Sequence, residues 1–509
     1  MVLALALASL AVAHLDGTDR SWILYYDSDS VLPALVRGSL LAGQPQNWAL
    51  SAVLFIPEMA LYLVVAALGL GIKGTFALNG VVNLLILFAV LRFLSGFAHG
   101  GLSRTRRVSG AVVAFATLVF LILLEDSPRQ DTFELASLLA TTTYYSMTVL
   151  ASVLTVGIVA RLSPSGEWTR WRSLKVALVA TSALSTVTNP LYIAWAVLPL
   201  MLLLILLARQ NVVGWHLIVR VGGLLLLSSG AGLVARIPLA HLVSKDGPAY
   251  AQPGMAGWAA AYYPQLVAHR TSTAGGAAAL TLIVCLVLVS VVVFGKCLGV
   301  GDSRAAIVSG MGWMAPVAVI IGMICVGAFG ARYLQPLFFA PVCTVVFAPR
   351  LVPTGLAFTR SLKSPAVEKL LAGAIGAGLA VSAGSMGSLS NSAGVVDSGI
   401  QCVVEWINAT HGTGAGNFWT IRGPKAYLSE PSRLVQVDKN FQAYPWLTDR
   451  ADYSSAMVSF VISDAAHPPP TMPSAAAALP SGTIHCGRYT ITDFGADVIP
   501  IGPPAALQK

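Results

Sequence analysis

The chain has 509 residues, of which 56% are hydrophobic and only 10% are charged. Soluble domains carry about 25% charged residues, so this composition excludes an ordinary soluble protein and indicates a polytopic membrane protein. The net charge of +9 does not indicate a nucleic-acid partner, because the Lys and Arg residues gather in short loops between apolar segments, where they set membrane orientation.

Eleven apolar segments follow one another along residues 1–390. A helix needs about 20 apolar residues to cross the hydrocarbon core of a membrane. We therefore predict an α-helical transmembrane domain over 1–390 with about eleven spans, at 2–14, 77–97, 109–124, 139–160, 175–187, 190–208, 217–236, 276–295, 306–328, 335–349 and 370–388.

The first predicted span is short and has no basic residues before it. Its end, Ala11-Val12-Ala13, resembles a signal-peptide cleavage site. A retained helix is the favoured interpretation, because so many spans follow it. Either alternative places the next loop on the outer side.

The apolar stretch 54–71 decides the side of every later loop. If it lies along or dips into the outer face without crossing, the positive-inside rule is satisfied, because the loops at 98–108, 161–175, 209–216, 296–305 and 350–369 hold most of the basic residues. Pro57 and Glu58 near its start also suit an interface better than a lipid-exposed span. We predict a multi-pass plasma-membrane protein whose loop 15–76 and C-terminal domain are extracytoplasmic.

The first outer loop carries Asp27-Ser28-Asp29. One interpretation is a solvated loop with interfacial aromatics such as Trp22 and Trp48. The other is a catalytic carboxylate that takes a proton from an acceptor hydroxyl, with Asp29 as a candidate ligand of a divalent cation, Mg or Mn. The sequence contains no complete set of metal ligands.

Three later outer segments hold candidate substrate-binding residues. Tyr144 and Tyr145 lie in a polar run at the end of a span, where hydroxyls can also simply bond backbone carbonyls. His269 and Arg270 lie in the longest outer loop, 237–275, which suits either a lid over a sugar phosphate or a surface anchor. Arg332 and Tyr333 precede a span, where the guanidinium could clamp a lipid-linked phosphate or reach the interface for solvation.

The composition changes at about residue 391, and 391–509 is predicted to form a small β-rich extracytoplasmic domain. Short β-prone runs are separated by Gly, Pro, Asn and Asp, at Gln401–Glu405, Phe418–Ile421, Leu434–Val437 and Met457–Ser463. Its aromatic residues could form core or stack on sugar rings. Cys402 and Cys486 bracket the domain and suggest a disulfide in an oxidising compartment.

The order of these parts resembles the GT-C superfamily of membrane glycosyltransferases. The resemblance rests on Asp27 and Asp29 after the first helix, on the Pro-led amphipathic helix Phe55–Tyr62, which contains Glu58, and on Arg332-Tyr333-Leu334-Gln335-Pro336 before a late span. It covers about residues 1–350 at the level of layout. It implies that Asp27 or Asp29 acts as base or metal ligand, that Arg332 contacts a phosphate, and that the donor is a polyprenyl-phosphate sugar.

The function expected from the sequence is transfer of a sugar from a lipid-linked donor to an envelope glycan or lipid acceptor. A transporter or flippase of lipid-linked envelope intermediates is the first alternative, and it should have carboxylates in the middle of its spans, which are not evident here. An inactive scaffold whose tail binds glycan is the second. The absence of Walker, Gly-x-Gly-x-x-Gly, His-Glu-x-x-His and Cys-x-x-Cys patterns argues against a pump with its own nucleotide site.

Overall fold

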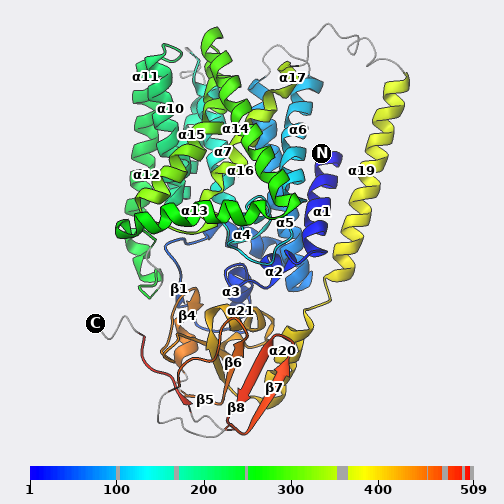
Figure 1. Ribbon diagram of the computed structural model, residues 1–509, viewed down its shortest axis with the longest axis vertical. Coiled ribbons are helices and arrows are strands. Elements are labelled where there is room, and N and C mark those ends of the chain that lie inside the picture. The colour runs from blue at the N-terminus through cyan, green and yellow to red at the C-terminus, as the bar shows by residue number, and fades with distance from the viewer. Residues whose placement is uncertain are drawn as a thin grey trace.

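The protein has a long helical part with a smaller β-containing domain at one end (Figure 1). The computed structural model describes residues 1–98, 104–164, 171–246, 250–351, 365–454, 457–472, 480–495 and 499–504. Figure 1 shows the helices side by side along the long axis, with both the N-terminus and α11 toward the end away from the β-containing domain.

Four helical segments are long and apolar enough to cross a membrane among the residues that the structure describes. They are α5 (Gly71–Ala98), the continuous segment Trp215–Ala235, α14 (Ala274–Val300) and α15 (Ser303–Cys325). The segment Trp215–Ala235 comprises α11 (Trp215–Leu217), a π-helical turn η3 (Ile218–Gly222) and α12 (Gly223–Ala235).

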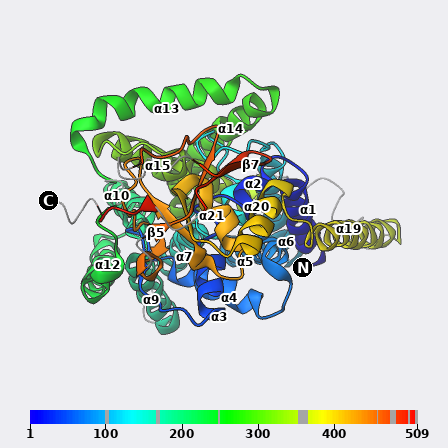
Figure 2. The same cartoon turned by 90° about the horizontal axis from the view of Figure 1, so that it is seen from below.

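Helices also occupy the other predicted spans, but their number as membrane crossings stays a prediction. They are α1 (Val2–Asp16), α6 (Arg104–Ile122), α7 (Ser146–Leu162), α9 (Arg172–Thr188), the π-helical turn η2 (Ile193–Val197) with α10 (Leu198–Arg209), α16 (Pro336–Thr344) with η7 (Val345–Phe347) and α17 (Ala348–Leu351), and α19 (Pro365–Ser392). Figure 2 shows α19 on the outside of the bundle, where it packs against α1.

The stretch 54–71 forms a short helix, α4 (Ile56–Ala66), of 11 residues. Before it, Trp48 pairs with Asp449 of the C-terminal domain. After it, the Lys73 ammonium lies 3.5 Å from the carbonyl oxygen of Val395, just ahead of that domain. The chain therefore enters and leaves α4 at the same end of the bundle, as expected of a stretch that does not cross, and its place relative to a membrane stays a prediction.

The described residues of the segments predicted as basic inner loops lie at the opposite end of the bundle (Figure 1). The Ser163 and Ser303 hydroxyls lie 2.9 Å apart there, and the Ser95 hydroxyl donates to the carbonyl of Arg107. Arg170, Arg360 and Lys363, on which the orientation prediction also rests, lie outside the described residues.

The predicted outer loops contain much local helix. The structure has α2 (Ser21–Tyr25), α3 (Leu32–Leu41), η1 (Ser137–Ala140), η4 (Ile237–Leu242), η5 (Pro253–Met255), α13 (Ala256–Thr271) and η6 (Ala331–Leu334). Figures 1 and 2 show α13 lying across one side of the bundle, nearly perpendicular to the long helices. One stripe of this helix is buried, at Ala259, Tyr263, Leu266 and Arg270.

The C-terminal domain is built on a five-stranded mixed sheet of order β3-β2-β6-β8-β7. Its strands are β2 (Gly414–Asn417), β3 (Leu434–Val437), β6 (Phe460–Asp464), β7 (Gly482–Cys486) and β8 (Tyr489–Asp493). Strand β2 is parallel to both β3 and β6, whereas β8 is antiparallel to β6 and β7. Two-stranded pairs join β1 (Trp48–Ala49) to β4 (Thr448–Asp449) and β5 (Met457–Val458) to β9 (Ile499–Pro500), and short turns form η8 (Pro431–Arg433) and η9 (Arg450–Ser454).

Two of the four predicted strands in this domain are wrong. Gln401–Glu405 lies in α20 (Ser398–Thr410) and Phe418–Ile421 lies in α21 (Phe418–Tyr427). Both helices begin with a capping side chain: the carboxylate of Asp397 accepts from the backbone N–H of Ile400, and Asn417 Oδ1 accepts from that of Trp419. The strands predicted at Leu434–Val437 and within Met457–Ser463 are confirmed as β3 and as β5 with β6.

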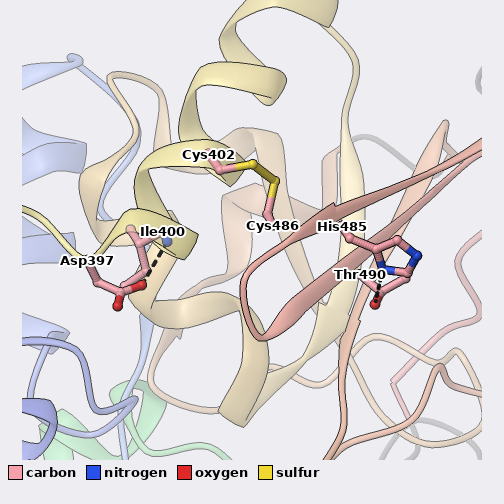
Figure 3. The surroundings of a disulfide bond; sticks show 6 residues. All are labelled: Asp397, Ile400, Cys402, His485, Cys486 and Thr490. Carbon is pink, nitrogen blue, oxygen red and sulfur yellow. Dashed lines mark hydrogen bonds between the residues drawn. A yellow bond between two sulfur atoms is a disulfide. The ribbon is translucent and has the colours of Figure 1, made fainter.

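The predicted disulfide between Cys402 and Cys486 is present (Figure 3). It joins α20 to the end of β7, with 5.4 Å between the two Cα atoms. The bond fixes the first helix of the domain to the β7–β8 hairpin.

Candidate functional site

Asp27-Ser28-Asp29 lies between α2 and α3, at the junction of the bundle and the C-terminal domain. All three residues are buried. The hydroxyl of Ser28 donates to the backbone carbonyl of Phe418, at the start of α21, over 2.9 Å. The segment predicted as an outer loop is therefore covered by the C-terminal domain, which forms one wall of the site.

The carboxylate of Asp27 accepts hydrogen bonds from one side chain and from the backbone. Its Oδ2 accepts from the hydroxyl of Tyr144 at 2.7 Å and from the backbone N–H groups of Asp29 and Ser30 at 3.0 and 3.4 Å. Burial, helped by the neighbouring charge of Asp29, raises the pKa of Asp27 to about 6 in spite of these hydrogen bonds. A carboxyl group with this pKa can accept a proton near neutral pH.

Asp29 has a different partner. Its Oδ2 lies 2.5 Å from Nη1 of Arg332, which follows Asp29 by 303 positions. The same guanidinium nitrogen is 3.4 Å from Oε1 of Gln130, and that oxygen lies 2.8 Å from the hydroxyl oxygen of Tyr144. Gln130 and Tyr144 thus connect the two aspartates through one polar network that also includes the cation.

The backbone around this network is held by further hydrogen bonds. The hydroxyls of Thr142 and Thr143 donate to the carbonyls of Ser30 and Asp29, at 2.7 and 2.6 Å. The side-chain amide of Gln335 donates to the carbonyl of Tyr144 at 2.9 Å. The three predicted segments that carry the Asp pair, the tyrosines and Arg332 are therefore brought together.

Arg422 of α21 is a site residue that the sequence did not indicate. It is fully buried, its Nε donates to the carbonyl of Ser28 at 2.7 Å, and its Nη2 has no hydrogen-bond partner among the described residues. Burial lowers the pKa of Arg422 to about 10, although the charges of Asp29 and Asp27 act in the opposite direction. No sequence motif marks it, because its position behind the aspartates depends on docking of the two parts of the chain.

Two polar cavities open on either side of Ser28. Asp27 lines a cavity of about 850 Å³, together with residues of the first loop, the 128–131 segment and the C-terminal domain. Asp29 and Arg332 line a second cavity of about 610 Å³. Trp419 lines both cavities. The two carboxylates therefore line different, neighbouring cavities.

A third cavity, of about 290 Å³, is lined almost entirely by apolar atoms, and one residue of its wall is Tyr333, whose ring centroid lies 5.8 Å from the Arg332 guanidinium. Tyr145 and Tyr333 form part of its wall, and their rings are stacked with centroids 6.5 Å apart. Tyr250, which also lines this cavity, has its ring 6.2 Å from that of Trp446, which lines the second polar cavity. An apolar chain placed there would end near the Arg332 guanidinium.

Tyr145 in the wall of this cavity and the neighbouring Phe55 have strained backbones. Tyr145 and Phe55 both have left-handed backbones, with φ values of 68° and 51°, and each precedes the first residue of a helix. Their rings are stacked with centroids 6.2 Å apart. Bulky residues adopt such φ values only where their surroundings enforce them, often near functional sites.

The structure does not bring Arg270, His269 or Glu58 to the aspartate pair. The Arg270 guanidinium pairs with Glu134 and donates to the carbonyl of Leu124 at 2.6 Å. His269 is exposed at the end of α13. Glu58 is buried in α4, and neither of its carboxylate oxygens has a hydrogen-bond partner among the described residues.

The divalent cation stays a prediction. The described residues contain no group of three or more His, Cys, Asp or Glu side chains suited to hold a metal ion. In the present arrangement Asp29 is paired with Arg332 and Asp27 accepts from Tyr144 and the backbone. These side chains do not form a metal site as they stand.

No protein-family model and no curated protein sequence matches this chain. Among solved structures, the Archaeoglobus fulgidus oligosaccharyltransferase, crystallised with zinc and sulfate, aligns with 91% of this chain and 68% of its own chain. The TM-score is 0.40 and the sequence identity is 12%. This similarity is too weak to assign the chain to a family.

Proposed function

We propose that the protein is an inverting membrane glycosyltransferase. It would transfer a sugar from a polyprenyl-phosphate donor to a cell-envelope glycan or lipid acceptor at the outer face of the plasma membrane. The observation that carries the proposal is the pair Asp27 and Asp29, which have different partners and face different polar cavities, beside an apolar cavity at one end of the bundle.

In this proposal Asp27 is the general base. Among the described residues no cation is bonded to its carboxylate, and its pKa of about 6 is matched to proton transfer near neutral pH. Asp29 is held in an ion pair with Arg332, which makes it a positioning and electrostatic group rather than a base. The two roles follow from the surroundings of two chemically identical side chains.

The reaction is a single displacement. The acceptor hydroxyl enters from the 850 Å³ cavity and its oxygen attacks the anomeric carbon of the donor, while Asp27 takes the hydroxyl proton. The bond between the anomeric carbon and the phosphate oxygen breaks, and polyprenyl phosphate leaves with the bonding electrons. Arg332 stabilises the charge that develops on the departing phosphate, since guanidinium groups pair closely with phosphate oxygens.

The donor lipid enters the site from the bundle. The apolar cavity lined by Tyr145 and Tyr333 takes the isoprenoid units nearest the phosphate. The apolar lining of this cavity lowers the local dielectric constant beside Arg332. The attraction between its guanidinium and the donor phosphate is therefore stronger than it would be in water.

The transporter alternative finds less support. None of the four segments long enough to span a membrane contains Asp or Glu. A proton- or ion-coupled carrier needs such groups within its spans. The buried carboxylates named above lie instead toward the end of the bundle that carries the C-terminal domain.

The test is turnover by the purified full-length protein with a panel of polyprenyl-phosphate sugars. We expect consumption of at least one donor, with release of polyprenyl phosphate. Asp27→Asn should lower the rate of transfer by about 10² to 10⁴ fold, which is the usual contribution of a general base.

The matched control is Asp126→Asn, which removes an exposed carboxylate near the same face. This variant should retain the wild-type rate. Failure to turn over any donor, or equal effects of Asp27→Asn and Asp126→Asn, would contradict the proposal.

A further inference from the structure

The 850 Å³ cavity on the Asp27 side is larger than a single hydroxyl group needs. Its walls come from two parts of the chain that are far apart in sequence. The first loop contributes Trp22 and Tyr26, whereas the C-terminal domain contributes Trp419, His467 and Arg488. A ligand in this cavity would contact the catalytic loop and the C-terminal domain at the same time.

The C-terminal domain meets the cavity with the carboxyl ends of parallel strands. Trp419 follows β2 by two residues, and His467 follows β6 by three. In sheets with parallel strands and a crossover helix, ligands bind at this edge, because loops and a helix start converge there. Here α21 connects β2 to the parallel strand β3 and begins beside Ser28.

Aromatic rings line the cavity. Trp419 is 36% exposed, although it packs edge-on against Phe418 with ring centroids 4.6 Å apart. Trp22 has the Arg488 guanidinium 4.5 Å from its ring centroid, and Tyr26 lies 5.5 Å from Trp22. Such rings offer apolar faces against which the C–H face of a sugar can stack.

Hydrogen-bond donors stand beside these rings in fixed positions. Asp464, at the end of β6, accepts from Arg488 at 2.9 Å and lies 3.0 Å from Nδ1 of His467. Its carboxylate is buried, whereas 40% of the Arg488 side chain and 31% of the His467 side chain remain exposed. The remaining N–H groups of Arg488 and the second ring nitrogen of His467 are therefore available to sugar hydroxyls.

The charge of the cavity selects against an anionic ligand. Four aspartates line it (Asp19, Asp27, Asp131 and Asp397) against two arginines (Arg129 and Arg488). Arg488 is already neutralised by Asp464. A phosphate, a nucleotide or an acidic polysaccharide would meet an excess of negative charge, whereas an uncharged sugar would not.

We propose that this cavity is the binding site of a neutral oligosaccharide acceptor, with Trp419 as the ring on which a sugar residue stacks. The inference rests on the proposed transferase function and adds the chemical class of the acceptor and the domain that recognises it. The C-terminal domain is then part of the substrate site, and not a separate glycan-binding appendage.

Binding can be measured by saturation-transfer NMR on full-length protein, purified in a detergent without a sugar head group. The probes are maltotriose and xylotriose as neutral trisaccharides and trigalacturonic acid as an acidic one. We expect a neutral trisaccharide to bind, and Trp419→Ala to weaken its Kd about tenfold, the size of effect that one stacked ring supports. Trp419→Phe should keep part of the affinity.

The control is Trp258→Ala, which removes a tryptophan that is 70% exposed on α13, outside the cavity. It should leave the Kd unchanged. In the transfer reaction, Trp419→Ala should raise the KM for the acceptor, whereas Trp258→Ala should leave it unchanged.

Three results would overturn the proposal: no binding of either neutral probe, equal loss of affinity in Trp258→Ala and Trp419→Ala, or tighter binding of the acidic probe. The two proposals fail separately. If a neutral sugar binds through Trp419 but no donor is consumed, the glycan site stands and the transferase function does not.

Discussion

Asp27 and Asp29 show how two identical side chains acquire different chemistry from their surroundings. Asp29 has a guanidinium partner, whereas Asp27 has a hydroxyl and two backbone N–H groups. Because Asp27 is buried without a cation bonded to it, its pKa rises to about 6. Which of the two is the base could not be decided from the sequence, and the contacts favour Asp27.

The pH dependence of transfer tests this assignment. A general base works only when it is ionised, so the rate should fall as the pH drops below about 6. The hydrogen bond from Tyr144 lowers the pKa of Asp27, and Tyr144→Phe removes it. We therefore expect the acidic limb of the kcat/KM profile of Tyr144→Phe to move to higher pH by about one unit.

Tyr25→Phe provides the control for this profile. Tyr25 is also fully buried near the first loop, but its hydroxyl makes no hydrogen bond to Asp27. The acidic limb of the Tyr25→Phe profile should coincide with that of the wild type. If the acidic limb of the kcat/KM profile of Tyr144→Phe lay at the same pH as that of the wild type, Asp27 would not be the group whose titration limits the rate.

Residue types in the sequence predicted part of this site and missed the rest. Asp27, Asp29, Arg332 and Tyr144 belong to residue types that carry catalysis and phosphate binding, and they gather at one place. Arg422 was missed because its only signal is its position, created when α21 docks on Ser28. The spacing of residues along the chain does not predict a contact such as that between Arg422 and Ser28, which lie far apart in the sequence.

At the scale of elements, capping residues outweigh β propensity. The run Gln401–Glu405 contains β-branched residues and was predicted as a strand. It is helical because Asp397 caps the segment and because Ile400, Val403 and Ile407 are spaced to bury one helix face. The mistaken strand at Phe418–Ile421 has the same cause, with Asn417 as the cap.

The helix α4 contains a buried carboxylate that should make the stability of the protein depend on pH. Burial raises the pKa of Glu58 from its usual 4.5 to about 7. As the pH rises, Glu58 loses its proton at a lower pH in the unfolded chain than in the folded protein. The free energy of unfolding should therefore fall as the pH rises from 4.5 to about 7 and stay constant above that. The loss is about 3 kcal/mol for a shift of this size.

Glu58→Gln replaces the carboxyl group with a neutral amide and should abolish this loss. We expect the Tm of the wild type to fall relative to that of the variant between pH 5 and pH 7.5, measured by thermal unfolding in detergent. Glu405→Gln, at an exposed position of α20, should follow the wild type. If the Tm of Glu58→Gln and of the wild type changed with pH in parallel, ionisation of Glu58 would not destabilise the folded protein.

The segment before η1 is joined to two other elements by a buried ionic cluster. Glu134 pairs with Arg270 of α13, and it lies 3.7 Å from Arg20 of the first loop. Glu134→Gln would leave two buried cations without their counter-charge, which costs about 3 to 5 kcal/mol. We expect a lower Tm and faster proteolysis in the 237–275 segment, whereas Glu405→Gln should cause neither change.

At the scale of the whole molecule, the loop that carries Asp27 and Asp29 and the C-terminal domain line one cavity. The sequence predicted two separate parts, because the composition changes sharply near residue 391. It could not predict that the parallel strands β2 and β6 end beside Asp27, since strand order and direction depend on contacts between distant segments. The disulfide could be predicted because two cysteines in one small domain leave a single pairing.

The position of this site relative to the membrane is the last feature that can be tested. The Asp pair and the C-terminal domain lie at one end of the bundle, and the described residues of the predicted basic loops lie at the other, so the positive-inside rule predicts that the site faces the outside. In a chain whose four free cysteines are replaced and whose disulfide is kept, Asn440→Cys should react with a membrane-impermeant maleimide in intact cells, and Gln210→Cys only after permeabilisation. Both positions are exposed, so the difference reports the side of the membrane alone. The reverse pattern would place Asp27 at the cytoplasmic face, where an envelope glycan cannot reach it.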